Sequence, residues 1–140
     1  MLDVCDALQN IDKLDGAVIS VRGYIRFGRE LEGLYGYNCP KKLLLEGEER
    51  AQAFHLANAP GVDDKELAAA MRPLVDEPNR CDTLQVTAVG TLKAGAFDGR
   101  KLRMFGHLGI YPAQIVVQAY RDVSTVAVPG FPSNMQSACH

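Results

Sequence analysis

The side chains best suited to bind a ligand are the arginines and tyrosines that gather between residues 22 and 37. An arginine beside an aromatic ring can grip a phosphate or stack on a base or a sugar. This pattern predicts a ligand or partner face made by Arg22, Tyr24, Arg26, Arg29, Tyr35 and Tyr37. The alternative is a solvated strand face whose tyrosines are half-buried at the rim of the fold. Glu30 and Glu32 dilute the positive charge of this stretch, and the chain has no Trp.

Patterns for catalysis and metal binding are missing from the sequence. No serine stands in a nucleophile elbow, and there is neither a P-loop nor a GxGxxG after a strand. The three histidines lie at spacings that do not bring zinc ligands together. We therefore expect a protein that is not an enzyme and that has no metal and no cofactor. A hydrolase is the least favoured alternative, because two carboxylates that meet only in space leave no sequence signal.

The four cysteines, Cys5, Cys39, Cys81 and Cys139, allow three disulfide pairings. We favour Cys5–Cys39, which would tie the N-terminal segment to a loop after the second strand. We also favour Cys81–Cys139, which would hold the end of the chain. The alternative is four free thiols in a cytoplasmic protein.

The chain has 140 residues, 47% of them hydrophobic, which is enough for one domain with a buried core. Its formal net charge is −2, whereas proteins that bind nucleic acid through its phosphates usually carry a basic surplus, so nucleic acid is a disfavoured partner.

No apolar run approaches the roughly 18 to 20 residues that span a membrane. The start, Met1-Leu2-Asp3-Val4, has neither a basic n-region nor an apolar h-region. The protein is then either cytoplasmic or a mature exported domain without its signal peptide, and its oligomeric state is open.

Alternating side chains predict a long first strand over 17–27, with Gly23 at its centre. A glycine inside a strand permits the sharp bend that a small closed barrel needs. Residues 86–92 repeat the core of this strand, 19–25, and place Gly90 where the first strand has Gly23. We therefore expect the two glycines to act as paired bending points of one barrel.

The remaining periodicity predicts short elements: a helix over 3–14, strands at 31–37, 42–46, 51–56, 83–93, 102–108 and 114–123, and a helix over 63–72 that Pro73 ends. In the second strand, Tyr35 and Tyr37 would stand one pleat apart on the same side. The order of elements is that of the OB-fold, a five-stranded Greek-key barrel. We expect a mainly β, OB-like barrel of five to six strands over residues 1–123, with an N-terminal helix and one inter-strand helix. An irregular C-terminal tail over 124–140, stapled by a disulfide, would follow.

A spaced pattern of cysteines, glycines and apolar residues runs through the first 39 residues. It consists of Cys5 and Leu8; then Gly16, Ile19, Val21 and Gly23; then Gly28, Glu30, Leu34, Tyr35 and Cys39. The pattern resembles that of a group of small bacterial OB-fold proteins, mostly uncharacterised and often exported, which are similar to tRNA-anticodon-binding OB domains. The resemblance covers most of residues 3–122, and its motifs are structural rather than catalytic. It implies an OB-like fold, a Cys5–Cys39 disulfide and a periplasmic location.

These features favour a non-enzymatic interaction module that binds a protein partner through the barrel face. The alternative is a ligand-binding OB-fold for an oligosaccharide or a single-stranded nucleic acid, because OB-folds bind both across their second and third strands and the adjoining loops.

Overall fold

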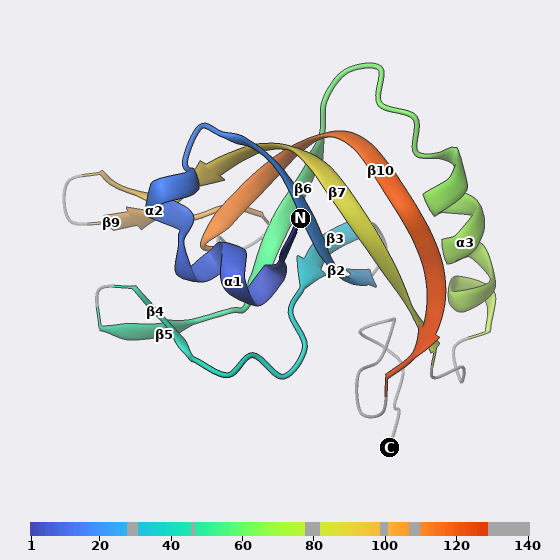
Figure 1. The fold of residues 1–140 in the computed structure, drawn as a ribbon, viewed down its shortest axis with the longest axis horizontal. Helices are drawn as coiled ribbons and strands as arrows, with labels where there is room; N and C mark the ends of the chain where they lie inside the picture. The colour runs from blue at the N-terminus through green and yellow to red at the C-terminus, as the bar shows by residue number, and fades with distance from the viewer. Residues whose placement is uncertain (28–30, 46, 78–81, 99–100, 107–109, 129–140) are drawn as a thin grey trace.

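The computed structural model of the protein describes residues 1–27, 31–45, 47–77, 82–98, 101–106 and 110–128. The candidate residue Arg29, the predicted Cys81–Cys139 disulfide and residues 129–140 lie outside the described residues. The elements in chain order are β1 (Leu2–Asp3), α1 (Val4–Gln9), α2 (Ile11–Leu14), β2 (Val18–Phe27), β3 (Leu31–Tyr35), β4 (Leu43–Leu45), β5 (Glu48–Arg50), β6 (Ala53–Asn58), α3 (Lys65–Asp76), β7 (Asp82–Ala94), β8 (Ala96–Asp98), β9 (Lys101–Arg103) and β10 (Ala113–Ala127) (Figure 1).

Five strands close into a barrel in the order β2-β3-β6-β10-β7, and β7 pairs back onto β2. The pair β6 and β10 runs parallel, whereas the other four neighbouring pairs run antiparallel. Helix α3 separates the third barrel strand from the fourth in the sequence. This topology is that of an OB-like barrel, so the predicted fold class is confirmed. The sixth strand of the sheet is β1, which pairs in parallel with β2.

Alternating apolar side chains of β2 and β7 fill the inside of the barrel. The buried ones are Ile19, Val21, Ile25, Leu84, Val86, Ala88 and Leu92. The two repeated segments pair with each other in antiparallel register, so Gly23 lies opposite Val86 and Gly90 lies opposite Ile19. The glycines are therefore not cross-strand partners, and their role as paired bending points stays a prediction. The missing Cβ of each glycine lets a different neighbour pack closely. At Gly23 the neighbour is the side chain of Val4, and at Gly90 it is the backbone of β10.

The helices lie on opposite sides of the barrel, α1 and α2 on one side and α3 on the other (Figure 1). The predicted N-terminal helix is broken at Asn10, and Asp3 caps its first part by accepting the Asp6 N–H at 2.7 Å. Helix α3 continues through Pro73 to Asp76, so its predicted end at residue 72 is wrong. Pro73 has no N–H, so one carbonyl of the preceding helical turn lacks its usual partner. Pro73 is exposed, so water can bond this carbonyl, while buried Leu74 anchors the last turn.

The last barrel strand, β10, is longer than the sequence predicts. It passes a bulge between Arg121 and Ser124 and then pairs with the start of β7 as far as Ala127. Asp122, inside the bulge, has a φ of 53°, a conformation that is uncommon for a residue with a side chain. The predicted strand end at residue 123 therefore falls inside β10, and residues 124–127 belong to the barrel.

Candidate functional site

Four of the six predicted site residues line one surface pocket of about 260 Å³, which we call the tyrosine pocket. Its lining residues are Asp3, Val4, Cys5, Arg22, Tyr24, Tyr35, Gly36, Tyr37 and Gln85. They come from the start of the chain, from the outer faces of β2 and β7, and from the end of β3. The sequence prediction of a shared face for Arg22, Tyr24, Tyr35 and Tyr37 therefore matches their placement, while their role in binding stays a prediction.

Strand pairing and one loop bring the three tyrosines together. Tyr24 of β2 lies directly across from Tyr35 of β3, so both rings stand on the outer face of the barrel. Tyr37 was predicted to stand on the same strand as Tyr35, but β3 ends at Tyr35. The chain turns at Asn38, where φ is 53°, and the Tyr37 ring meets the Tyr24 ring edge-on with centroids 6.1 Å apart. Tyr37 is 44% exposed, which makes it the most accessible of the three rings.

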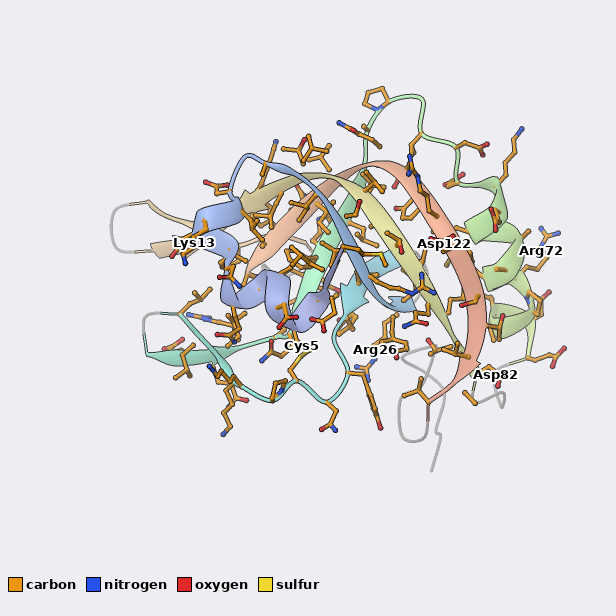
Figure 2. The ribbon with its side chains drawn as sticks, viewed as in Figure 1. Cys5, Lys13, Arg26, Arg72, Asp82 and Asp122 are labelled. Carbon is orange, nitrogen blue, oxygen red and sulfur yellow. A yellow bond between two sulfur atoms is a disulfide. The ribbon has the colours of Figure 1, made fainter. Side chains whose placement is uncertain are left out.

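Arg26 extends the tyrosine pocket along β2. Its guanidinium carbon lies 5.0 Å from the centroid of the Tyr35 ring, within the range of a cation–π contact. Figure 2 labels Arg26 beside the lower end of the barrel. The contact fixes the Tyr35 ring from one side and gives this face an arginine–tyrosine pair.

Arg22 lines the pocket, but it uses its guanidinium to hold the barrel together. One nitrogen, Nη1, donates to Thr87 Oγ1 at 3.1 Å and to the carbonyl of Asp122 at 3.1 Å. The other, Nη2, donates to Gln85 Oε1 at 3.3 Å and to Ser124 Oγ at 3.5 Å. These bonds join β2 to β7 and to the bulge of β10, which Figure 2 marks at Asp122. Phosphate binding by Arg22 would break them.

Substituting Arg22→Ala is expected to lower the free energy of unfolding by about 1 to 3 kcal/mol, because bonds from a charged donor are lost and buried Thr87 loses a partner. Urea unfolding followed by circular dichroism measures the change. Arg121→Ala is the matched control, since Arg121 is an exposed arginine at the same bulge. Equal effects of the two substitutions would contradict a structural role for Arg22.

The outer face of β3 and β6, where OB-folds bind their ligands, is covered by a tyrosine that sequence reasoning missed. Tyr111 is only 3% exposed, and its ring lies so close to Gly33 and Gly106 that a Cβ atom at either glycine would come within 2.7 Å of it. Its hydroxyl lies 3.1 Å from the Tyr35 hydroxyl. Gly33 is far from Tyr111 in the sequence, so its close approach left no local signal. The protein's own ring therefore occupies this part of the face.

His55 of β6 lies beside the Tyr111 ring, with centroids 5.6 Å apart. The Gln114 side-chain amide donates to its Nδ1 at 2.9 Å, which requires Nδ1 to be unprotonated. Burial lowers the pKa of His55 below its ordinary value. The folded protein therefore holds the neutral imidazole and disfavours its protonation.

The stability that neutral His55 contributes is expected to be complete above about pH 6.5 and to be lost as the pH falls below it, because the unfolded chain binds this proton more tightly. As the pH falls through about 6.5, unfolding should then take up less than one proton at this site. His55→Gln should remove that part of the pH dependence in urea unfolding at several pH values, since the other histidines are common to both proteins. The same slope in both proteins would contradict the assignment.

Fold and pocket together define the class of this protein as an OB-like barrel with a tyrosine-lined surface pocket. Comparisons of the chain with protein-family models, with curated proteins and with solved structures found no match. The resemblance to small bacterial OB-fold proteins thus stays a prediction. Among the described residues, no three His, Cys, Asp or Glu side chains group in a way that could hold a metal ion. No helix in the described part of the chain has the length and apolar character to cross a membrane.

Proposed function

We propose that the protein is a non-enzymatic docking module that binds a protein partner through the tyrosine pocket and the surrounding outer face of β2 and β3. The observation that carries the proposal is the convergence of Tyr24, Tyr35 and Tyr37 on one pocket, with Arg26 on the Tyr35 ring. Tyrosine and arginine are enriched among the residues that dominate binding energy at protein interfaces. Tyrosine offers a large contact area, and its ordering costs little conformational entropy.

Nucleic acid is a poorer fit to the same face. Arg22 already donates to four oxygen atoms of the protein, and the chain as a whole has a net charge of −2. Nucleic-acid affinity depends on cations that neutralise phosphates. Tyr111 further covers the outer face of β3 and β6, on which bases would stack. These features support a protein partner over a single-stranded nucleic acid.

An oligosaccharide is the second candidate, because Asp3, Arg22 and Gln85 line the pocket beside the aromatic rings. Sugar hydroxyls need such polar partners in addition to a ring. Asp3 accepts a bond from the Asp6 N–H, and Gln85 accepts one from Arg22, so these groups already serve the fold. This commitment favours the protein partner.

An exported location, periplasmic in a bacterium, belongs to the same proposal. The Cys5–Cys39 disulfide supports it, because structural disulfides persist in oxidising compartments and are rare in the cytoplasm.

A photoreactive phenylalanine analogue at position 37 tests the proposed face in cells that naturally make the protein. We expect a discrete protein adduct from position 37 and none from Leu44, which is 60% exposed but lies on β4 outside the pocket. With the captured partner in hand, Tyr24→Ala should weaken binding about thirtyfold, the effect of losing a tyrosine hot spot. Leu44→Ala is the matched control.

Two results would overturn the docking proposal. One is the same adducts from both positions. The other is binding of an oligosaccharide or a short single-stranded DNA to the purified protein that Tyr24→Ala abolishes, which would make the tyrosine pocket a small-ligand site.

A further inference from the structure

We propose that the Cys5–Cys39 disulfide sets the state of the tyrosine pocket, so that reduction by a dithiol loosens one wall of the pocket and turns docking off. The docking part of this inference rests on the proposed function. The loosening of the wall can be measured without any partner.

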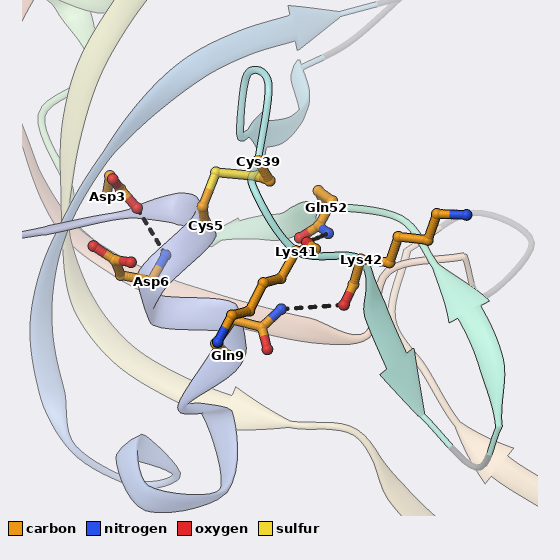
Figure 3. Close-up of a disulfide and its surroundings, with 8 residues drawn as sticks. All are labelled: Asp3, Cys5, Asp6, Gln9, Cys39, Lys41, Lys42 and Gln52. Atoms are coloured by element: carbon orange, nitrogen blue, oxygen red, sulfur yellow. Dashed lines mark hydrogen bonds between the residues drawn. A yellow bond between two sulfur atoms is a disulfide. The ribbon is translucent and has the colours of Figure 1, made fainter.

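The disulfide joins the two facing walls of the pocket. One wall is the start of the chain, where Asp3, Val4 and Cys5 line the pocket. The other wall is the end of β3 and the residues after it, including Gly36 and Tyr37. Cys39 follows Tyr37 by two residues and is bonded to Cys5, so the bond fixes the segment that carries the exposed ring (Figure 3).

Gly36 shows how closely this wall packs on the sulfur atoms. A Cβ atom at Gly36 would lie 2.7 Å from the Cys39 Sγ and 3.0 Å from the Cys5 Sγ. The backbone of the wall therefore rests directly against the disulfide, with room for a glycine alone. The Sγ atoms are thus part of the support under the pocket wall as well as the covalent link between its two sides.

The two ends of the segment are both bonded to Gln52, the residue before β6. The Gly36 N–H donates to the Gln52 carbonyl at 2.9 Å, and the Gln52 side-chain amide donates to the Lys41 carbonyl at 2.8 Å (Figure 3). The barrel strands keep their ladders without the disulfide, since β3 pairs with β2 and β6. Reduction should therefore release the middle of the segment, with Tyr37, and leave the barrel closed.

The chemistry of the switch is thiol–disulfide exchange. A thiolate of a dithiol attacks one sulfur of the half-buried pair, which gives a mixed disulfide and one free cysteine. The second thiol of the dithiol then displaces the other cysteine. Two electrons and two protons pass to Cys5 and Cys39, and the dithiol leaves as its own disulfide.

Backbone ¹⁵N relaxation of the full chain, with and without dithiothreitol, tests the inference. Order parameters of residues 37–42 are expected to fall from about 0.85 to below about 0.6 on reduction, while those of β7 between residues 84 and 92 stay at about 0.85. Cys39→Ser should reproduce the reduced pattern without reductant. Unchanged order parameters in residues 37–42 would overturn the inference, and so would an equal fall in β7.

Gly36→Ala keeps both cysteines and so separates the pocket wall from the loss of the crosslink. Its added Cβ presses on both Sγ atoms, and we expect lower order parameters in residues 37–42 with the disulfide intact. Unchanged order parameters there would contradict the support that the disulfide gives to the wall.

The photoreactive analogue at position 37 distinguishes the two proposals. Loss of its protein adduct in the Cys39→Ser background supports the switch, whereas a persisting adduct overturns the switch and leaves docking intact. Absence of any adduct from the oxidised chain counts against docking alone, because the relaxation measurements still decide whether the disulfide controls the pocket.

Discussion

Reduction of the Cys5–Cys39 disulfide is expected to lower the free energy of unfolding by about 4 kcal/mol. The bond joins residues 34 positions apart, so its loss returns the conformational entropy of a long loop to the unfolded chain. The folded state changes less, because β2 and β3 lie within that loop and keep their pairing. Domains commonly have about 5 to 15 kcal/mol of stability, so the reduced barrel should still fold, with a much smaller margin.

Urea unfolding with and without dithiothreitol measures this loss, and the double variant Cys5→Ser with Cys39→Ser is the control. The double variant should unfold at the same lowered urea concentration in both buffers, which assigns the effect to this bond and not to Cys81 or Cys139. A loss below about 1 kcal/mol would show that the unfolded chain already holds these segments together.

The barrel could be predicted from the sequence because each of its strands carries its own signal. Alternation along 17–27 and its repeat at 86–92 identify buried faces, and a strand has only two faces to choose from. The Cys5–Cys39 disulfide was one of three possible pairings for Cys5, and the structure confirms it. The outer residues Tyr24 and Tyr35 could be grouped for the same reason, since alternation places them outward on neighbouring strands.

The features that could not be predicted depend on contacts between distant segments. The bulge at Asp122 extends β10, and it is held by Arg22, a residue 100 positions earlier in the chain. Helix α3 passes Pro73 because Leu74 finds a buried site on the barrel. Tyr111 lies over Gly33 only because strand pairing brings that glycine beneath it. No local pattern contains these partners.

The chemistry of the candidate site also depends on contacts between distant segments, so the sequence alone does not predict it. Arginine next to tyrosine suggests ligand binding when it is read along the strand, yet Arg22 and Arg26 have different surroundings. Arg22 donates to the barrel itself, whereas Arg26 lies over the Tyr35 ring. Only the neighbouring strands decide which of two similar arginines is structural.

Gly90→Ala is expected to lower the free energy of unfolding by about 3 kcal/mol and the melting temperature by roughly 10 °C. The added Cβ would lie 2.1 Å from the Val116 carbonyl oxygen and 2.9 Å from the Val117 Cα. Both atoms belong to the backbone of β10, so no side chain can rotate away, and the β7–β10 ladder must shift instead. Thr91→Ala, at the next position of β7, is the control and should cost less than about 1 kcal/mol.

Gly23→Ala offers the sharpest comparison, because the two glycines occupy equivalent places in the repeated strands but meet different obstacles. The added Cβ at Gly23 would lie 2.5 Å from Val4 Cγ2 and 2.9 Å from Leu34 Cγ, which are side-chain atoms, and 2.9 Å from the Tyr35 carbonyl. Val4→Ala removes the closest of these atoms, so Gly23→Ala should cost less in a Val4→Ala background than in the natural chain. Gly90→Ala should cost the same in both backgrounds. Equal coupling of both glycines to Val4 in thermal unfolding would contradict the conclusion that Gly23 and Gly90 each admit their own neighbour.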